Sequence, residues 1–258
     1  MPEPGQQMRA AERIAAILGS FSAARTQLTL SEIARESGLD KNTARRLLLA
    51  LAETGLIARA EDLYSLGSRV LQLQPAVHAP RALREAASPW LHDLTRAVEM
   101  TSFAWMPDPD GAICVERAST HRTIFTALNW SSPGTLLPLN VAAGPRAILG
   151  HLDPVARAAW LARPQPAFTQ HSQTDPAALA AEADVIRAQG HAWVPNDYVV
   201  GLAGLGVPVL DRQGRLAGSI SVTAATHVLE DPGTLARTLA ALRAVAAEVG
   251  LRLQGAPG

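Results

Sequence analysis

The stretch that decides the fold of the N-terminal part is Thr29–Gly55, TLSEIARESGLDKNTARRLLLALAETG. Thr29 and Glu32 have the spacing of a capping box, which predicts that a short helix begins here. Gly38 suits a left-handed C-cap, and Asp40 is placed to cap a second, longer helix. A short helix, a three-residue turn and a longer helix are the order of a helix-turn-helix motif.

The flanking sequence extends this motif on both sides. Upstream, the segment 9–20 and the residue after it repeat apolar side chains at helical spacing, which predicts a first helix. Downstream, LIARAEDLYSLG (56–67) alternates around an acidic turn, as a β-hairpin does. We therefore predict a winged helix-turn-helix over residues 8–68, with three helices and a hairpin wing. Its expected core is Ile33, Ala34, Leu39, Leu47, Leu48 and Leu51. A three-helix bundle of no particular function has the same local pattern and remains an alternative.

The start of the second helix concentrates positive charge in a chain whose formal net charge is +0. Three cations at a helix N-terminus oppose the helix dipole, whereas a DNA backbone would neutralise them. Arg pairs with guanine and Asn with adenine in the major groove, so Asn42, Arg45 and Arg46 are candidate base readers. Lys41, Thr43 and the hairpin's Arg59 are better suited to phosphates. The competing interpretation is the solvated face of an amphipathic helix.

Residues beyond the hairpin predict a helical linker, 69–81, and then a larger domain, 82–258. Hairpins are expected around PDPDG (107–111) and DRQG (211–214), a strand near 122–130, and helices between them and at the C-terminus. This order is typical of an α+β fold, with an antiparallel sheet and helices packed on it.

Composition and motifs argue against several function classes. One cysteine among 258 residues excludes an intramolecular disulfide framework and cysteine-based zinc fingers. The seven histidines are scattered, and HExxH, GxSxG and the P-loop pattern are missing. The glycines of GLAGLG (201–206) precede a predicted hairpin, not the helix of a dinucleotide site. We therefore expect no catalytic residue, no metal and no cofactor. Without a long apolar run or a signal peptide, a soluble cytoplasmic protein with no membrane partner is expected.

Several segments, in the same order along nearly the whole chain, resemble the IclR (isocitrate-lyase regulator) family of bacterial transcription factors. They are LSEIARESGLDKNTARRLL (30–48), YSLGSRVLQL (64–73), GTLLPLNVAAGPRAILG (134–150), VIRAQGHAW (185–193) and DYVVGLAGLGVPVLDRQGRLAGSISVTA (197–224). The resemblance implies a winged helix-turn-helix, a linker helix and a GAF-like effector domain. It also implies a homo-oligomer, in which dimers pair into tetramers, and repression as one mode of action.

The resemblance further implies an effector pocket between the sheet and the helix after GTLLPLNVAAG. Backbone N–H groups at Ala142, Ala143 and Gly144 would meet an acid ligand. Gly204 stands where some members have a cysteine, which would leave more room and less polarity. The other implied effector-binding residues are Asp197, Ser221 and Thr223 on the polar side and Leu128 and Trp130 on the apolar side.

The sequence is thus interpreted as a DNA-binding regulator. Its partners would be double-stranded operator DNA, further copies of the chain and a small carboxylate or aromatic acid effector. The alternative is a constitutive DNA-binding protein whose C-terminal domain only oligomerises; an enzyme is disfavoured.

Overall fold

The computed structural model describes residues 10–22, 25–73, 78–119 and 132–253, and the chain divides into two compact units between Val77 and His78. This division falls inside the predicted linker, 69–81. Helix α4 (Ser68–Leu73) belongs to the first unit, and α5 (His78–Val98) begins the second.

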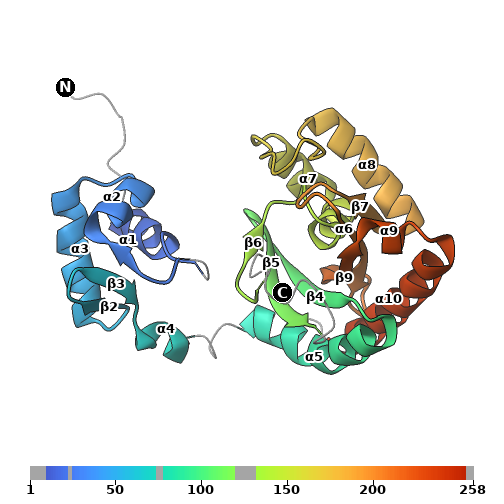
Figure 1. Ribbon diagram of the computed structural model, residues 1–258, viewed down its shortest axis with the longest axis horizontal. Helices are drawn as coiled ribbons and strands as arrows, with labels where there is room; N and C mark the ends of the chain where they lie inside the picture. Colours follow the sequence, from blue (N-terminus) through green and yellow to red (C-terminus); the bar gives the residue numbers. More distant parts are fainter. Residues whose placement is uncertain (1–9, 23–24, 74–77, 120–131, 254–258) are drawn as a thin grey trace. The chain divides into compact units, whose positions relative to one another are not determined.

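The first unit is a winged helix-turn-helix, as predicted (Figure 1). Its helices are α1 (Ala10–Gly19), α2 (Leu30–Ser37) and α3 (Lys41–Glu53). The predicted hairpin is formed by β2 (Ile57–Ala60) and β3 (Leu63–Leu66), and β1 (Leu28–Thr29) adds a third antiparallel strand in the order β1-β3-β2. Strand β1 was not predicted, because a two-residue strand has no periodicity of its own.

Local capping chemistry fixes the helix boundaries in this unit. The Thr29 hydroxyl accepts a hydrogen bond from the Glu32 N–H at 3.3 Å, and the Glu32 carboxylate accepts from the Thr29 N–H at 2.8 Å. Gly38 ends α2 at φ 67°, and the Asp40 carboxylate caps α3. Ile33, Leu48 and Leu51 of the predicted core pack together with Ile17, Ile57 and Tyr64. Leu39 and Leu47 are partly exposed and pack against this cluster, and Ala34 is buried.

The second unit is built on a six-stranded antiparallel sheet in the order β6-β5-β4-β9-β8-β7. Its strands are β4 (Thr101–Asp108), β5 (Gly111–Ala118), β6 (Leu136–Leu137), β7 (Ala192–Pro195), β8 (Leu202–Leu210) and β9 (Leu216–Ala225). The two predicted hairpins are β4–β5 and β8–β9, and β4 pairs with β9 at the centre of the sheet. The α+β prediction is confirmed, whereas the strand expected near 122–130 lies outside the described residues.

Helices cover both faces of this sheet (Figure 1). Helices α5 and α10 (Pro232–Arg252) pack on one face, over a core that includes Leu205 and Val222. Helix α6 (Ala143–His151) lies on the other face, and α8 (Pro176–Gln189) and α7 (Pro154–Leu161) pack outside it. The short helix α9 (Thr226–Leu229) follows β9.

Glycines let α6 approach β8 closely. Side chains alternate along a strand, so Gly204 and Gly206 face α6 while Leu205 points into the opposite core. A Cβ at Gly206 would lie 2.5 Å from the Ala143 carbonyl oxygen, so only glycine fits there. This contact sets the start of α6 against the sheet. None of the helices in the described part of the chain is long and apolar enough to span a membrane.

Candidate functional site

The exposed face of α3 carries unneutralised positive charge. Lys41, Asn42, Arg45 and Arg46 are exposed, and Thr43 is half-buried. Within the described residues, the structure gives the side chains of Lys41, Arg45 and Arg46 no hydrogen bond or ion pair. These cations are therefore available to an external anion.

The neighbouring helix α2 shows the contrast. Its Arg35 pairs with Glu36 at 3.3 Å, and Arg25 pairs with the same carboxylate at 3.1 Å. The acid that precedes α3, Asp40, is engaged as the cap: its carboxylate accepts hydrogen bonds from the Thr43 and Asn42 N–H groups at 2.9 and 3.0 Å. These bonds lower the pKa of Asp40 and keep it ionised at the positive end of the helix.

Arg59 has a structural role within the wing. Its Nε donates to the Glu61 carbonyl at 2.9 Å, and its guanidinium lies 5.7 Å from the centre of the Tyr64 ring. These contacts hold the turn between β2 and β3, where Glu61 has φ 55°. A phosphate contact by Arg59 stays a prediction.

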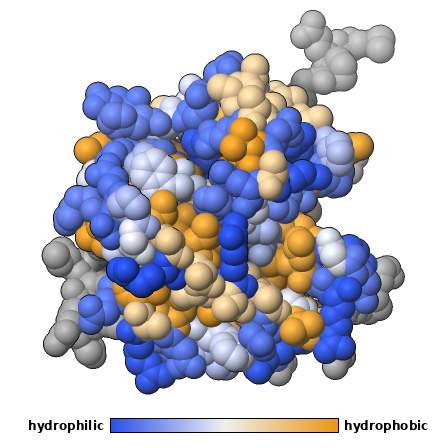
Figure 2. Space-filling view, turned by 90° about the vertical axis from the view of Figure 1, so that its right-hand side faces the viewer, coloured by the Kyte–Doolittle hydropathy of each residue, from blue (hydrophilic) through white to orange (hydrophobic). Residues whose placement is uncertain are grey.

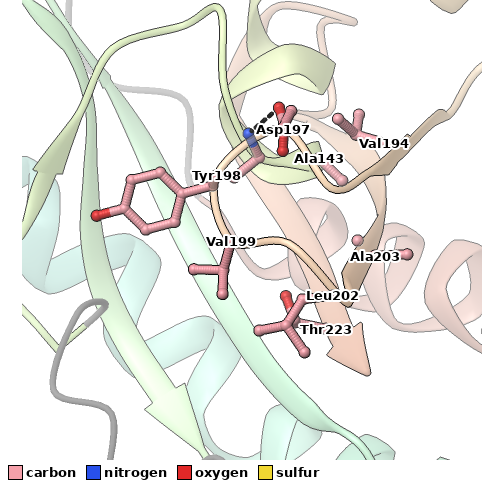
Figure 3. A pocket seen from close by; sticks show the side chains of 10 residues that line it. Ala143, Val194, Asp197, Tyr198, Val199, Leu202, Ala203 and Thr223 are labelled. Atoms are coloured by element: carbon pink, nitrogen blue, oxygen red, sulfur yellow. Dashed lines mark hydrogen bonds between the residues drawn. The ribbon is translucent and has the colours of Figure 1, made fainter. Parts of the chain in front are cut away.

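In the second unit, a small cavity lies where the start of α6 meets β7, β8 and β9 (Figure 3). Its volume is about 20 Å³, room for about one water molecule. Val199, Leu202 and Thr223 lie together on one side of Asp197, and the Tyr198 ring points away from the Asp197 carboxylate. The lining residues are Ala142, Ala143, Val194, Asp197, Tyr198, Val199, Leu202, Ala203, Gly204 and Thr223.

The cavity brings together only part of the set that the family resemblance implies. Ala142, Ala143, Asp197, Gly204 and Thr223 line it. Leu128 and Trp130 lie outside the described residues.

Two further members of that set, Gly144 and Ser221, are not among the lining residues and are engaged with Trp105. The Ser221 hydroxyl accepts a hydrogen bond from Trp105 Nε1 at 3.0 Å, and a Cβ on Gly144 would lie 2.3 Å from Trp105 Cδ1. Gly144 therefore makes room for an indole ring.

The family resemblance implied that Gly204, which stands where some members have a cysteine, leaves more room in the pocket. The structure shows no such room beside Gly204. A Cβ at this position would lie 2.9 Å from the Ala143 Cβ, so the space is already filled by the start of α6. Glycine here serves the close approach of helix and strand.

Asp197 is the central polar group of the cavity. Its Oδ2 accepts a hydrogen bond from the Ala142 N–H at 2.8 Å, and only 4% of the residue is exposed. Burial raises the pKa of Asp197 to about 6, although Arg146 and the Ala142 N–H act in the opposite direction. The Ala142 N–H, expected to be free for an acid ligand, is therefore occupied by a carboxylate of the chain.

Arg146 is a site residue that the sequence reasoning missed. It lies in the first turns of α6, is 4% exposed, and donates from Nε to the Asn140 carbonyl at 3.0 Å. The same Nε is 3.7 Å from Asp197 Oδ2, and an Arg146 nitrogen forms an ion pair with Glu182 of α8. A lone arginine inside the apolar run VAAGPRAILG was the available signal, because buried charges need partners. The sequence gives no comparable signal for the other lining residues that were not predicted, which are Val194, Tyr198, Val199, Leu202 and Ala203.

Comparison with known proteins gives two matches that together span both units. Residues 10–61 match the IclR helix-turn-helix domain, and residues 76–251 match the C-terminal domain of bacterial IclR transcriptional regulators. The chain belongs to the IclR family. It is a DNA-binding transcriptional regulator and not an enzyme, since the family and the curated relatives are regulators.

Individual relatives agree over nearly the full length. The glycerol operon regulatory protein of Streptomyces coelicolor is 28% identical over 255 residues, covering 95% of this chain and 98% of that protein. An IclR transcriptional regulator structure from Silicibacter sp. TM1040 has a TM-score of 0.81 at 26% identity, covering 93% and 94% of the two chains. An IclR homolog from Microbacterium hydrocarbonoxydans, solved in complex with 4-hydroxybenzoate, has a TM-score of 0.79 at 24% identity, covering 94% and 98%.

Proposed function

We propose that this regulator binds an operator through α3 and that a small organic acid in the cavity at the start of α6 modulates this binding. The observation that carries the proposal is a cavity lined mostly by apolar residues, with three polar side chains, Asp197, Tyr198 and Thr223. Few polar groups in an apolar lining are typical of small-molecule sites. The homolog solved with 4-hydroxybenzoate supports an aromatic acid as the first class to test.

DNA reading is assigned to the exposed face of α3. Asn42, Arg45 and Arg46 would contact base edges, because the first turns of a recognition helix enter the major groove. Lys41, Thr43 and Arg59 would contact phosphates and set the register. Binding to chromosomal DNA would place the protein in the bacterial cytoplasm.

Three parts of the chain would have different roles. Residues 8–68 would bind DNA, and 82–258 would bind effector and oligomerise. The linker 69–81 would couple them and, through Leu71 and Leu73 of α4, add to the contact between copies. Coupling requires that the effector bind two states unequally. The cavity of about 20 Å³ must open to admit an aromatic acid, since ligand pockets usually enclose roughly 300 Å³ or more. Opening of the segment 196–201, which carries Asp197 and Val199, is the change that ligand would stabilise.

The small cavity also supports the second candidate, a constitutive DNA-binding protein whose C-terminal domain only oligomerises. A panel of aromatic and short-chain acids separates the two. Each acid would be added to a thermal melt and to a gel shift with an operator fragment found by genome-wide occupancy. We expect at least one acid to raise the melting temperature and change operator affinity. If no acid does either, the constitutive function is favoured.

A homo-oligomer is part of the proposal. Helix α4 has no buried residue, and Leu71 and Leu73 on it are 70% and 48% exposed. On the side of α8 and α10, apolar residues gather between hydrophilic ones (Figure 2), and these helices carry the exposed Val185 and Leu251. Burial of such side chains against a second copy would stabilise a dimer. Light scattering of Leu71→Glu tests this, with Val155→Glu, which alters the 78% exposed Val155 of α7, as the matched control.

A further inference from the structure

The start of α6 already holds a carboxylate of the chain. Asp197 Oδ2 lies 2.8 Å from the Ala142 nitrogen and 3.7 Å from Arg146 Nε. A helix N-terminus and a guanidinium are the groups that would attract an anionic ligand, and here both face Asp197. The dashed line in Figure 3 marks the hydrogen bond that Asp197 accepts. A carboxylate ligand in this cavity therefore meets a negative charge.

No further positive charge paired with Asp197 in the described part of the chain is left to neutralise the carboxylate of a bound ligand. Arg146 is the one cation paired with Asp197 among the described residues, and it also pairs with Glu182 of α8. One guanidinium thus serves two carboxylates before any ligand arrives. The neighbours of Asp197 from the strands and from the segment 164–175 are uncharged: Ala203, Gly204, Thr223, Thr169 and Ser172.

Other titratable groups near this region are engaged elsewhere. Arg163 pairs with Asp110, Asp175 caps α8, and the exposed His171 hydrogen-bonds Gln170. The Tyr198 ring points away from the Asp197 carboxylate, and burial raises the pKa of its phenol, so it adds no charge at neutral pH.

We propose that Asp197 is the specificity-determining residue of the cavity: a carboxylic acid binds together with one proton, whereas a neutral ligand of the same shape binds without one. Two carboxylates in one site cannot both stay ionised at low cost, so they share a proton taken from solvent. Burial has already raised the pKa of Asp197 to about 6, which makes this proton easy to acquire near neutral pH. The inference rests on the proposed function.

The Asp197 carboxyl can keep its hydrogen bond to the Ala142 N–H after it takes up a proton, and this bond holds Ala142 in a strained backbone conformation. Ala142 has φ 59°, a left-handed conformation that is unfavourable for a residue with a Cβ. Its N–H is held by Asp197 Oδ2, and a protonated carboxyl still offers a carbonyl oxygen to that N–H. The other Asp197 oxygen can then donate its proton to the ligand carboxylate.

Titration calorimetry of the full-length protein with 4-hydroxybenzoate, benzoate and pyruvate, and with the amides of these acids, tests the proposal. Each ligand is titrated at pH 6 and pH 8 in two buffers of different ionisation enthalpy, which counts the protons taken up. With a pKa of about 6, uptake for an acid should be about half a proton at pH 6 and about one at pH 8. The affinity of an acid should fall about 50-fold between these pH values, and that of an amide should not change.

Asp197→Asn keeps an acceptor for the Ala142 N–H and removes the charge. For this variant we expect no proton uptake and equal affinity for the acid at both pH values. Asp184→Asn is the control, because it removes an exposed carboxylate that pairs with Arg157 and does not line the cavity, so it should keep the proton uptake of the wild type. If Asp197→Asn does not fold, the wild-type proton count still decides.

The outcomes separate the two proposals. If an acid binds the wild type without proton uptake and equally at pH 6 and pH 8, the role of Asp197 is overturned while the effector function stands. If none of the acids or amides binds at either pH, the effector function fails, and the role of Asp197 fails with it.

Discussion

Replacement of Arg46 by alanine should remove operator binding while leaving the fold intact. Arg46 is exposed on α3 and has no hydrogen bond or ion pair among the described residues. Its removal should therefore change the free energy of unfolding by less than about 0.5 kcal/mol. A lost base contact costs about 1–3 kcal/mol, or roughly 5- to 150-fold in affinity for one DNA-binding unit. Two such units in a dimer roughly multiply these factors, which is enough to abolish a gel shift.

The assay is a salt-dependent gel shift or fluorescence anisotropy titration with the operator and a scrambled duplex. If Arg46 reads a base, Arg46→Ala lowers operator affinity much more than affinity for the scrambled duplex. If Arg46 contacts a phosphate, both affinities fall together and the slope of log affinity against log salt drops by about 1. Arg46→Lys keeps the charge but not the bidentate geometry, so it distinguishes the same alternatives.

Arg96→Ala is the matched control, since it removes the same charge from an exposed arginine of the second unit. It should leave DNA binding unchanged. Unchanged operator affinity in Arg46→Ala, or a loss no larger than in the control, would refute the role of α3 argued above. A large fall in melting temperature would instead show that Arg46 stabilises the fold.

Four further outcomes are expected. Gly206→Ala should destabilise the second unit by about 1–3 kcal/mol, because the new Cβ would lie 2.5 Å from the Ala143 carbonyl oxygen. Urea melts followed by tryptophan fluorescence measure this loss, because all five tryptophans belong to the part of the chain from residue 78 onward. Thr29→Ala should lower stability by about 1 kcal/mol through loss of the capping box, measured by calorimetry. Leu71→Glu should shift the light-scattering mass toward the monomer. Burial raises the pKa of Asp197 in the folded protein from 3.8 to about 6, so protonation of this carboxyl favours the folded state. This stabilising contribution is full below pH 3.8 and is lost as the pH rises to about 6. Over this range the free energy of unfolding of the wild type should fall by about 3 kcal/mol from this group, and pH-dependent melts of Asp197→Asn should lack this fall.

Local chemistry explains what could be predicted from the sequence. The caps at Thr29 and Asp40 and the C-cap at Gly38 involve residues two to four positions apart, so the spacing along the sequence predicts them. The hairpins β4–β5 and β8–β9 are likewise joined by short turns. Strands β1, β6 and β7 were missed because they are too short to show a periodicity, and β1 and β6 become strands only by pairing with residues far away in the chain.

The effector cavity shows the limit of the family pattern. Ser221 and Thr223 alternate on β9 as expected, but Thr223 lines the cavity whereas Ser221 is bonded to Trp105, which lies 116 residues away in the chain. Ser221 and Thr223 point to the same face of β9, and the residue that packs against each one decides which of them reaches the cavity. The spacing along a single strand does not reveal these packing partners.

The sequence by itself determined the helix-turn-helix, its cationic face and the family, because these depend on short-range spacing and on an ordered set of motifs. Only the tertiary structure showed that Asp197 occupies the start of α6 and that Arg146 is buried between Asp197 and Glu182. Asp197 and the Ala142 N–H are 55 residues apart. The physical reason is that burial and charge pairing are set by long-range packing, here by the glycines that bring α6 onto β8.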